Sequence, residues 1–360
     1  MSKRNEIGRI AFLLSSLKFG GGERVALNLA NALQAKGYQI DFLLMSYEGE
    51  FLHEAESKFN VFDLNCDKTY KLPYKLFLYL IRQRPSVLLS SFWKLNLCSC
   101  LAKLFYPSVR LLLWEHSPPS KSRNSPRWLY AVSVSVFYRM AHRIITVSSG
   151  VYNDVANWSV GLRNKLIVIF NPIVPPSAEL ILQVGQTYNR QIVWVGRLEE
   201  PKNPMLALEA FSQMADSTVN LVFIGDGSLR NQLERRCIDL GLMEQVTFLG
   251  FQPRPYDVMA NSDLLVLSSN REGLGNVIIE AMFCGLPVVA TDCGEGIHDI
   301  LLDNKYGTIV PNGDKNSLAK AMTKALEIKC NRQYQIAGAV RFLPENIANQ
   351  FLAVMFEKHN

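Results

Sequence analysis

The sequence predicts an α/β protein with two domains, each built on a parallel sheet that carries helices on both faces. Short apolar segments that suit strands alternate along the whole chain with amphipathic segments that suit helices, which is the pattern of parallel sheets. The length of 360 residues is too great for one ordinary core. It suits two domains of roughly 150 to 180 residues each.

The first half of the chain supplies six predicted strands. They are Ile10–Leu14, Ile40–Met45, Val87–Ser90, Arg110–Trp114, Arg143–Val147 and Leu166–Phe170. Helices are predicted between them, notably at Glu23–Lys36, Leu72–Arg84 and Ser125–Met140. The segment Asn171–Pro176 (NPIVPP) cannot form regular structure, because proline has no amide hydrogen to donate. It is therefore predicted to be the linker between the domains.

A second series of strands follows the linker. They are Ile192–Val195, Asn220–Ile224, Val246–Leu249, Asp263–Leu267, Pro287–Ala290 and Gly307–Val310. A last helix is predicted at about Pro344–Lys358, after a proline break. These boundaries place residues 1–173 in the first domain and residues 174–343 in the second.

Composition indicates a globular cytosolic protein. Apolar residues make up 48% of the chain and charged residues 19%, which excludes a disordered protein. The seven cysteines form no Cys-x-x-Cys pair, so we expect reduced, mostly buried thiols and no metal site. No uninterrupted apolar run reaches 18 residues, which argues against a membrane-spanning helix. The apolar stretch Ile10–Leu17 lacks a cleavage site and is interpreted as a first strand, not a signal peptide.

Positive charge is concentrated in the first half of the chain. Residues 1–173 carry 22 Lys and Arg against 11 Asp and Glu, whereas residues 174–360 carry 16 against 21. Between Lys68 and Arg143 there are 13 basic residues and a single acidic one, interleaved with aromatic residues. Such a face fits an acidic polysaccharide or an anionic membrane surface, and a solvated face with buried aromatic side chains is the alternative. Nucleic acid is not expected, because no nucleic-acid-binding module is recognisable.

The most informative stretch is Glu272–Glu280 (EGLGNVIIE), which follows the strand-like segment Asp263–Ser268. The run Asn276–Phe283 suits a helix, with a Gly-rich turn at its start. Amide groups at a helix start bind anions, and glycine lets a phosphate approach the backbone. The two carboxylates then suit sugar hydroxyls on either side of a diphosphate. A capped core helix with a solvated Glu280 is the alternative.

Two cations precede that stretch. Ile192–Leu198 (IVWVGRL) is a strand that ends in Arg197, and Lys202 follows five residues later. Arginine offers a planar fork and lysine a point charge, so the pair can neutralise a diphosphate. A further Gly-rich turn, Gly225–Arg230, follows the next strand.

Four motifs, G-R-L…K-N, I-G-D-G-S-L-R, F-L-G and E-G-L-G-x4-E, occur in this order. Together they resemble glycosyltransferase family 4, of the retaining, bacterial envelope-polysaccharide type. The resemblance implies a GT-B fold, in which two Rossmann-like domains face each other across a cleft. It also implies that residues 344–360 form a helix that crosses back to the N-terminal domain.

The resemblance assigns roles to the residues of these motifs. Arg197 and Lys202 would hold the diphosphate and stabilise it as it leaves. The amides of Leu274, Gly275 and Asn276 would assist them. Glu280 would bind the ribose hydroxyls, Glu272 would contact the transferred sugar, and Phe251 would lie in the loop that binds the base.

Two further elements of the site are expected in the first domain. The turn Gly20–Gly22 follows the first strand, but Val25 occupies the third glycine position of a dinucleotide fingerprint, so no dinucleotide cofactor is expected. By resemblance, Gly21 and Gly22 instead face the donor phosphates across the cleft and border the acceptor; a tight turn is the alternative. By the same resemblance His116, just past a strand, faces the donor sugar; a structural histidine is the alternative.

The resemblance therefore implies a metal-independent enzyme with no cofactor. Asp-x-Asp, the metal-binding motif of other glycosyltransferases, occurs nowhere in the chain. Glu272, His116, Arg197 and Lys202 are the expected catalytic residues, with no covalent intermediate on a carboxylate.

The expected reaction transfers a hexose or N-acetylhexosamine, with retention, from a nucleotide sugar, a UDP-sugar being favoured. The expected acceptor is a polyprenyl-diphosphate-linked saccharide in O-antigen, capsule or glycan assembly, bound by the basic first domain at the inner face of the cell membrane. A soluble acceptor such as a sugar phosphate, and a catalytically silent assembly subunit, are the alternatives.

Overall fold

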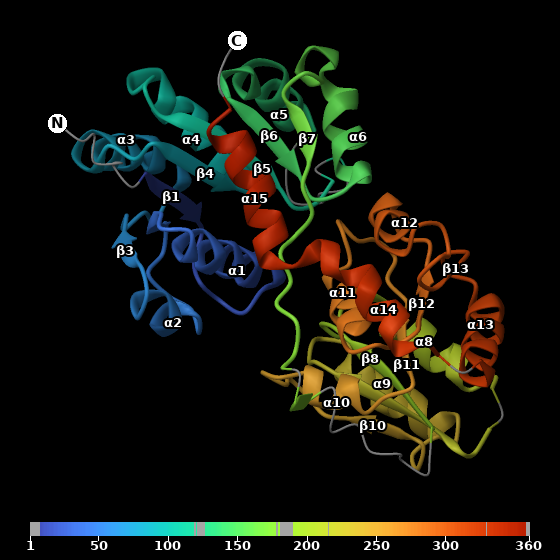
Figure 1. Cartoon of the computed structure of the whole chain (residues 1–360). Helices are drawn as coiled ribbons and strands as arrows, with labels where there is room; N and C mark the ends of the chain where they lie inside the picture. The colour runs from blue at the N-terminus through green and yellow to red at the C-terminus, as the bar shows by residue number, and fades with distance from the viewer. Residues whose placement is uncertain are drawn as a thin grey trace. The chain divides into compact units, whose positions relative to one another are not determined.

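The computed structural model describes residues 8–118, 120, 127–177, 179–180, 190–214, 216–328 and 330–357. It confirms the predicted fold class, because the chain forms two compact units, each with one parallel sheet and helices (Figure 1). The N-terminal unit comprises the chain up to Pro172 and again from Pro344 onward. The C-terminal unit comprises Ile173–Leu343.

The sheet of the N-terminal unit has seven parallel strands in the order β3-β2-β1-β4-β5-β6-β7. They are β1 (Arg9–Leu14), β2 (Gln39–Leu44), β3 (Asn60–Asp63), β4 (Val87–Ser91), β5 (Arg110–Glu115), β6 (Arg143–Thr146) and β7 (Leu166–Val168). The chain runs outward from β1 to β3 and then returns to place β4 on the other side of β1. In open α/β sheets, ligands bind beyond the carboxyl ends of the strands at such a reversal.

Seven α-helices of the described residues accompany this sheet. They are α1 (Gly21–Ala35), α2 (Leu52–Glu56), α3 (Leu72–Gln83), α4 (Trp93–Phe105), α5 (Arg127–Val132), α6 (Ser149–Trp158) and α15 (Pro344–Met355). As expected, the last helix belongs to the N-terminal unit: α15 packs against α1, and Arg110 donates a hydrogen bond of 2.8 Å to the carbonyl of Met355 (Figure 1). The predicted end of this helix, Lys358, lies outside the described residues.

The predicted elements of the N-terminal unit differ from the structure in two places. Strand β3 was missed, because only two apolar residues, Val61 and Phe62, stand between polar ones and none of the four is buried. The predicted helix Ser125–Met140 is α-helical only over α5; it continues as a π-helical turn, Ser133–Phe137, and a 3-10 turn, Tyr138–Met140. Residues 125 and 126 lie outside the described residues.

Not all aromatic residues of the basic segment belong to a surface. Tyr79 is buried, and its hydroxyl donates a hydrogen bond of 2.5 Å to Asp41 on β2. Asn60 on β3 donates to the other oxygen of the same carboxylate at 2.9 Å. Asp41 is thus a buried anion whose hydrogen bonds join α3 to the edge of the sheet, and burial of such a group requires these partners.

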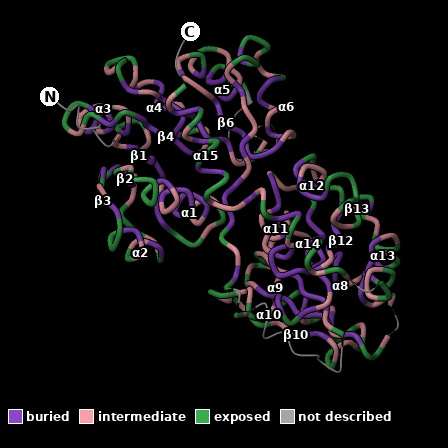
Figure 2. The backbone as a smooth tube through the Cα atoms, in the orientation of Figure 1, coloured by how far each residue is buried: buried purple, intermediate pink, exposed green. Residues whose placement is uncertain are grey.

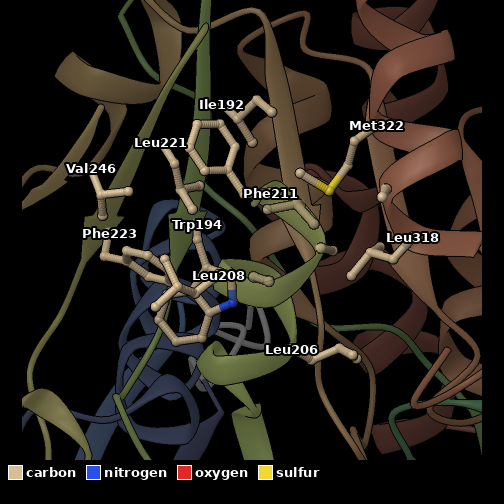
Figure 3. Packing of buried hydrophobic residues seen from close by; sticks show 14 of the residues in the cluster. Ile192, Trp194, Leu206, Leu208, Phe211, Leu221, Phe223, Val246, Leu318 and Met322 are labelled. Atoms are coloured by element: carbon tan, nitrogen blue, oxygen red, sulfur yellow. The ribbon is translucent and has the colours of Figure 1, made fainter. Parts of the chain in front are cut away.

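The C-terminal unit has six parallel strands in the order β10-β9-β8-β11-β12-β13. They are β8 (Arg190–Val195), β9 (Val219–Ile224), β10 (Val246–Phe248), β11 (Leu264–Leu267), β12 (Val288–Thr291) and β13 (Thr308–Val310). The strand order reverses between β8 and β11. The inner strands β9, β11 and β12 are buried almost throughout, as parallel strands covered on both faces must be, whereas the edge strands β10 and β13 are partly exposed (Figure 2). Trp194, with Phe223 and Phe211, anchors the core on one face of the sheet (Figure 3).

Seven α-helices of the described residues complete the C-terminal unit. They are α8 (Pro204–Phe211), α9 (Arg230–Asp239), α10 (Tyr256–Ala260), α11 (Asn276–Phe283), α12 (Glu295–Leu301), α13 (Lys315–Glu327) and α14 (Arg332–Ala339). Asn203, Asp314 and Asn331 cap α8, α13 and α14 through their side-chain oxygens. Helix α11, like α9, α10 and α12, has no side-chain cap, and Gly275 precedes it.

The described residues of the two units contain neither a membrane span nor a disulfide. Across the described ranges, every helix is too short or too polar to cross a bilayer. All seven cysteines are free thiols, and six of them are buried.

Candidate functional site

The predicted site residues of the C-terminal unit lie in loops that follow the carboxyl ends of neighbouring strands. Arg197 and Lys202 follow β8, and Glu272 follows β11, so the two loops flank the reversal of strand order. Phe251 follows β10, two strands from β8. The sheet therefore brings these residues together along one edge, although Arg197 and Glu272 are 75 positions apart in sequence.

The loop after β8 is held rigidly against the loop after β9. The amide of Gly196 donates to Ile224 O, and that of Leu198 donates to Asp226 O, both at 2.9 Å. Gly225 has a φ of +130°, and a Cβ there would lie 1.8 Å from Gly196 O. Only glycine allows this approach. The close contact at Gly196 fixes the backbone of the loop after β8 directly before Arg197.

Arg197 is exposed, and its guanidinium makes no hydrogen bond or ion pair within the described residues. Its neighbour Glu199 is occupied, because it accepts hydrogen bonds from the amide and the hydroxyl of Ser228 at 2.9 and 2.7 Å. These bonds, and then the charge of Arg197, lower the pKa of Glu199. Glu199 therefore fixes the turn after β9, while the Arg197 guanidinium remains available to an anion.

Lys202 and Glu272, which were expected to act on different parts of a ligand, form an ion pair. The Nζ of Lys202 lies 2.6 Å from Oε1 of Glu272, and the side chains are only 27% and 10% exposed. Ser269 donates a second hydrogen bond of 2.7 Å to the same oxygen. The partly buried setting strengthens this attraction relative to a surface pair. An anion that binds Lys202 must therefore compete with Glu272.

The start of α11 provides a second positive element. Gly275 has a φ of +93°, and Asn276 begins the helix with no side-chain cap. Leu274 is buried, and the turn is supported by α12, where a Cβ on Gly296 would lie 2.6 Å from Gly273 O. The helix dipole and the first amides favour an anion at this point.

Glu280 lies on α11 as a partly buried carboxyl group without a partner. It makes no side-chain hydrogen bond or ion pair with any residue in the described ranges. Burial raises its pKa to about 7, and the charge of Lys202 opposes that shift. The carboxylate oxygens of this partly buried group can therefore accept hydrogen bonds from ligand hydroxyls.

Three residues that sequence reasoning missed hold the two loops together. Asn270 donates hydrogen bonds from its backbone to Pro201 O at 2.9 Å and from its side chain to Glu200 O at 3.0 Å. Beneath them, the indole of Trp194 donates to Ser268 at 3.0 Å, and Ser268 donates to Asn203 O at 2.8 Å. A Ser-Ser-Asn run directly after a buried strand was the only signal for Ser268 and Asn270.

Phe251 lies beside the turn after β9. The amide of Gly225 donates to Gly250 O at 2.8 Å, and the Phe251 side chain is 53% exposed. An exposed aromatic side chain at the carboxyl edge of the sheet suits a flat ligand group.

The predicted residues of the N-terminal unit lie around its own reversal of strand order. Gly21 and Gly22 begin α1 after β1, and His116 follows β5. A Cβ on Gly22 would lie 2.8 Å from the ring of Phe92, which gives a steric reason for glycine there. The imidazole of His116 packs against Phe92 and Trp114 at centroid distances of 5.1 and 4.5 Å. Burial lowers its pKa to about 3, so the ring is neutral at pH 7.

No group of three or more His, Cys, Asp or Glu side chains in the described part of the chain is arranged to hold a metal ion. The positively charged side chains that the structure places at the candidate site are those of Arg197 and Lys202.

Comparisons with known proteins identify two sequence families in the chain. The model of Glycosyltransferase Family 4 matches residues 19–175, and that of Glycosyl transferases group 1 matches residues 184–341. Two relatives come from Campylobacter jejuni. One, N-acetylgalactosamine-N,N'-diacetylbacillosaminyl-diphospho-undecaprenol 4-alpha-N-acetylgalactosaminyltransferase, is 28% identical and covers 89% of this chain and 90% of its own length.

The second relative is 25% identical, and the match covers 98% of this chain and 99% of the relative's own length. Its name is GalNAc-alpha-(1->4)-GalNAc-alpha-(1->3)-diNAcBac-PP-undecaprenol alpha-1,4-N-acetyl-D-galactosaminyltransferase. Among solved structures, Anabaena HepE in complex with UDP has a TM-score of 0.80 at 23% identity and covers 96% of this chain and 98% of its own. At that identity the likeness supports the fold alone, which is the GT-B fold that the sequence predicted.

The pKa of Glu280 makes the stability of the C-terminal unit depend on pH. The ordinary carboxyl value is 4.5 and the folded value about 7, so ionisation destabilises the native state as pH rises between them. Glu280→Gln cannot ionise, so it should raise the melting temperature of this unit above pH 7. The corresponding gain in the free energy of unfolding is up to roughly 3 kcal/mol, at 1.36 kcal/mol per pKa unit. The measurement is the melting difference from the unaltered protein at pH 5 and pH 8. An equal difference at both values would show that Glu280 titrates normally.

Proposed function

We propose that this chain, which belongs to the family 4 and group 1 glycosyltransferases, transfers a hexose or N-acetylhexosamine from a UDP-sugar to a saccharide carried on a polyprenyl diphosphate. One observation carries the proposal. Two cations, a helix start without a side-chain cap and two carboxyl groups lie along one edge of the C-terminal sheet, around its reversal of strand order. This set of groups suits a diphosphate with a sugar on each side.

The order of the strands suggests how the donor lies. Phe251, after β10, would contact the base. Arg197 and Lys202, after β8, would bind the diphosphate together with the amides of Leu274, Gly275 and Asn276. Glu280 would accept the ribose hydroxyls, and Glu272 would bind the sugar that is transferred once Lys202 turns to the phosphate. The ion pair between Lys202 and Glu272 thus orders both side chains before the donor arrives.

The reaction follows from these positions. An acceptor hydroxyl oxygen forms a bond to the anomeric carbon as the bond from that carbon to the diphosphate oxygen breaks. The hydroxyl proton passes to the departing diphosphate, and the products are the extended saccharide and UDP. Arg197, Lys202 and the start of α11 stabilise the charge that develops on the diphosphate. We propose attack from the face of the leaving group, with retention and with no carboxylate as nucleophile.

The acceptor class is inferred from the relatives and from the charge of the first half of the chain. The names of both Campylobacter jejuni enzymes specify acceptors on undecaprenol diphosphate. Such an acceptor lies in a membrane, and this chain has a suitable face on α3 and α4. Tyr74 on α3 and Phe105 on α4 are 64% and 70% exposed, and α3 also carries the cations Lys75 and Arg82. We propose that this face binds the inner surface of the cell membrane.

The proposed donor site predicts that a UDP-sugar binds without a metal. With excess EDTA present, a UDP-sugar should raise the melting temperature of the protein more than a GDP-sugar or an ADP-sugar does, because a ligand that binds only the native state stabilises it. A shift that disappears in EDTA and returns with Mn²⁺ would contradict binding by Arg197, Lys202 and the helix dipole alone. A catalytically silent subunit would show the shift but no release of UDP when an acceptor is added.

The two cations should dominate turnover. Arg197→Ala and Lys202→Ala should each lower kcat/KM. The lost stabilisation of the transition state should be about 2.7–4 kcal/mol, the usual loss when a group that stabilises developing negative charge is removed. Glu280→Ala should mainly raise the KM for the donor, whereas Glu272→Ala should lower kcat. Lys320→Ala, an exposed lysine on α13, is the matched control. Unchanged kcat/KM in either cation variant would contradict binding of the diphosphate at this edge of the sheet.

Because Lys202 and Glu272 are paired, their single variants should not be additive. In the double variant Lys202→Ala/Glu272→Ala, the loss should be smaller than the sum of the single losses, since Lys202→Ala also leaves Glu272 without its partner.

The membrane face should make binding to vesicles depend on charge. Each lysine or arginine near an anionic surface contributes about 1 kcal/mol, and salt screens the attraction. The protein should co-sediment with phosphatidylglycerol vesicles, be released at high salt and ignore neutral vesicles. Lys75→Glu/Arg82→Glu should weaken sedimentation but not hydrolysis of the donor, and Lys320→Glu/Lys324→Glu on α13 is the matched control. Equal binding to neutral and anionic vesicles, or binding to neither, would favour a soluble acceptor.

A further inference from the structure

Phe92 has a backbone conformation that is unusual for a residue with a side chain. Its φ is +70° and its ψ is 139°. Other non-glycine residues with positive φ, such as Arg84, Asn203 and Leu302, have ψ values of 53° to 58° and lie in the ordinary left-handed region. The conformation of Phe92 lies outside that region, in a part of φ/ψ space that is essentially reserved for glycine. Such strain persists only where the surrounding structure imposes it.

The place of Phe92 in the fold is that of a ligand site. It follows β4 directly and precedes α4, so it stands at the reversal of strand order, opposite the turn that follows β1. Its amide donates a hydrogen bond of 3.2 Å to Trp114 O, and its carbonyl accepts one of 2.9 Å from Asn96. The tip of the ring points at Gly22, so a Cβ on that glycine would lie 2.8 Å from the ring's Cζ.

The ring of Phe92 ends a column of aromatic side chains that begins at the last helix. Phe351 on α15 contacts Trp114 at a centroid distance of 5.1 Å, Trp114 contacts His116 at 4.5 Å, and His116 contacts Phe92 at 5.1 Å. Trp114 and His116 are two positions apart and so share one face of β5 and its extension. The imidazole is therefore held on two sides by larger rings.

His116 has unused hydrogen-bonding capacity at this position. Its Nε2 is buried and has no hydrogen-bond partner among the residues that the structure describes. No carboxylate compensates for this, because the adjacent Glu115 is directed to Asn96 and Tyr138, both of which donate to its Oε1. Burial is the cause of the lowered pKa of His116. A neutral imidazole without a partner can accept or donate one hydrogen bond to a substrate hydroxyl.

We propose that Phe92 is a positioning residue, whose strained backbone holds its ring between the Gly22 turn and His116 and so fixes the imidazole for a sugar hydroxyl at the strand-order reversal of the N-terminal unit. This inference rests on the proposed glycosyl transfer, because a sugar supplies the hydroxyl. The ring excludes water from one side of the imidazole, and Trp114, supported by Phe351, covers another. The strained backbone belongs to Phe92 and the buried nitrogen without a described partner belongs to His116, and the rings of these two residues are in contact.

Titration of His116 tests the contact without the reaction. In protein labelled with ¹⁵N-histidine, the ring nitrogens of His116, assigned with His116→Gln, should not titrate above pH 5. Phe92→Ala admits water to the ring, so His116 should titrate between pH 5 and 7. Phe62→Ala, which removes a partly buried ring on β3, should behave as the unaltered protein. The same titration of His116 in Phe92→Ala and in the unaltered protein would overturn the proposal.

Stability separates the strained backbone from the ring. Phe92→Ala and Phe92→Gly both remove the ring, but only glycine adopts this conformation without strain. Phe92→Gly should therefore melt at a higher temperature than Phe92→Ala. Equal melting temperatures would show that residue 92 does not hold the positive φ in solution.

Activity completes the test. Phe92→Ala should lower kcat by on the order of a hundredfold, the loss expected from a misplaced group, with little change in the KM for the donor, and kcat should gain an acid limb near pH 6. An unaltered protein that transfers no sugar would refute the proposed function and leave the titration result standing. An unaltered protein that transfers sugar, with a Phe92→Ala variant of the same kcat and pH profile, would refute the role of Phe92 alone.

Discussion

Adjacency of β8 and β11 is the constraint on which the candidate site depends. These strands pair in parallel, so the loops after them must leave the sheet at the same edge, although 70 positions separate Lys202 from Glu272. Asn270 joins the two loops through backbone carbonyls, and Trp194 supports them from the core through Ser268. The ion pair between Lys202 and Glu272 is therefore a consequence of strand order, and the charge balance of the site follows from it.

The N-terminal unit uses the same geometry for different chemistry. Its reversal of strand order lies between β1 and β4, and its loops bring glycine backbone, an aromatic ring and a neutral imidazole together rather than cations and carboxylates. Each half of the chain thus places reactive or contacting groups where a parallel sheet leaves a crevice. The fold supplies the position, and the residues at the strand ends supply the chemistry.

The sequence predicted the elements that carry strong local signals. Buried parallel strands are continuous apolar runs, so all but one were found, and the Gly-rich turns at their ends marked Arg197, Glu272 and Gly22. Long-range pairing left no such signal. Strand β3 is too short and too exposed to be predicted. The burial of Tyr79 depends on its hydrogen bond to Asp41, and the positive φ of Phe92 depends on neighbours on α1 and β5. Such contacts depend on tertiary packing, which overrides local propensity.

The central claim is that the edge between β8 and β11 binds the diphosphate of a nucleotide sugar. A crystal structure with UDP tests it most directly. We predict that the diphosphate contacts Arg197, Lys202 and the first amides of α11, that Lys202 leaves its 2.6 Å contact with Glu272, and that the ribose bonds to Glu280. A diphosphate bound elsewhere, with the ion pair between Lys202 and Glu272 intact, would contradict the claim.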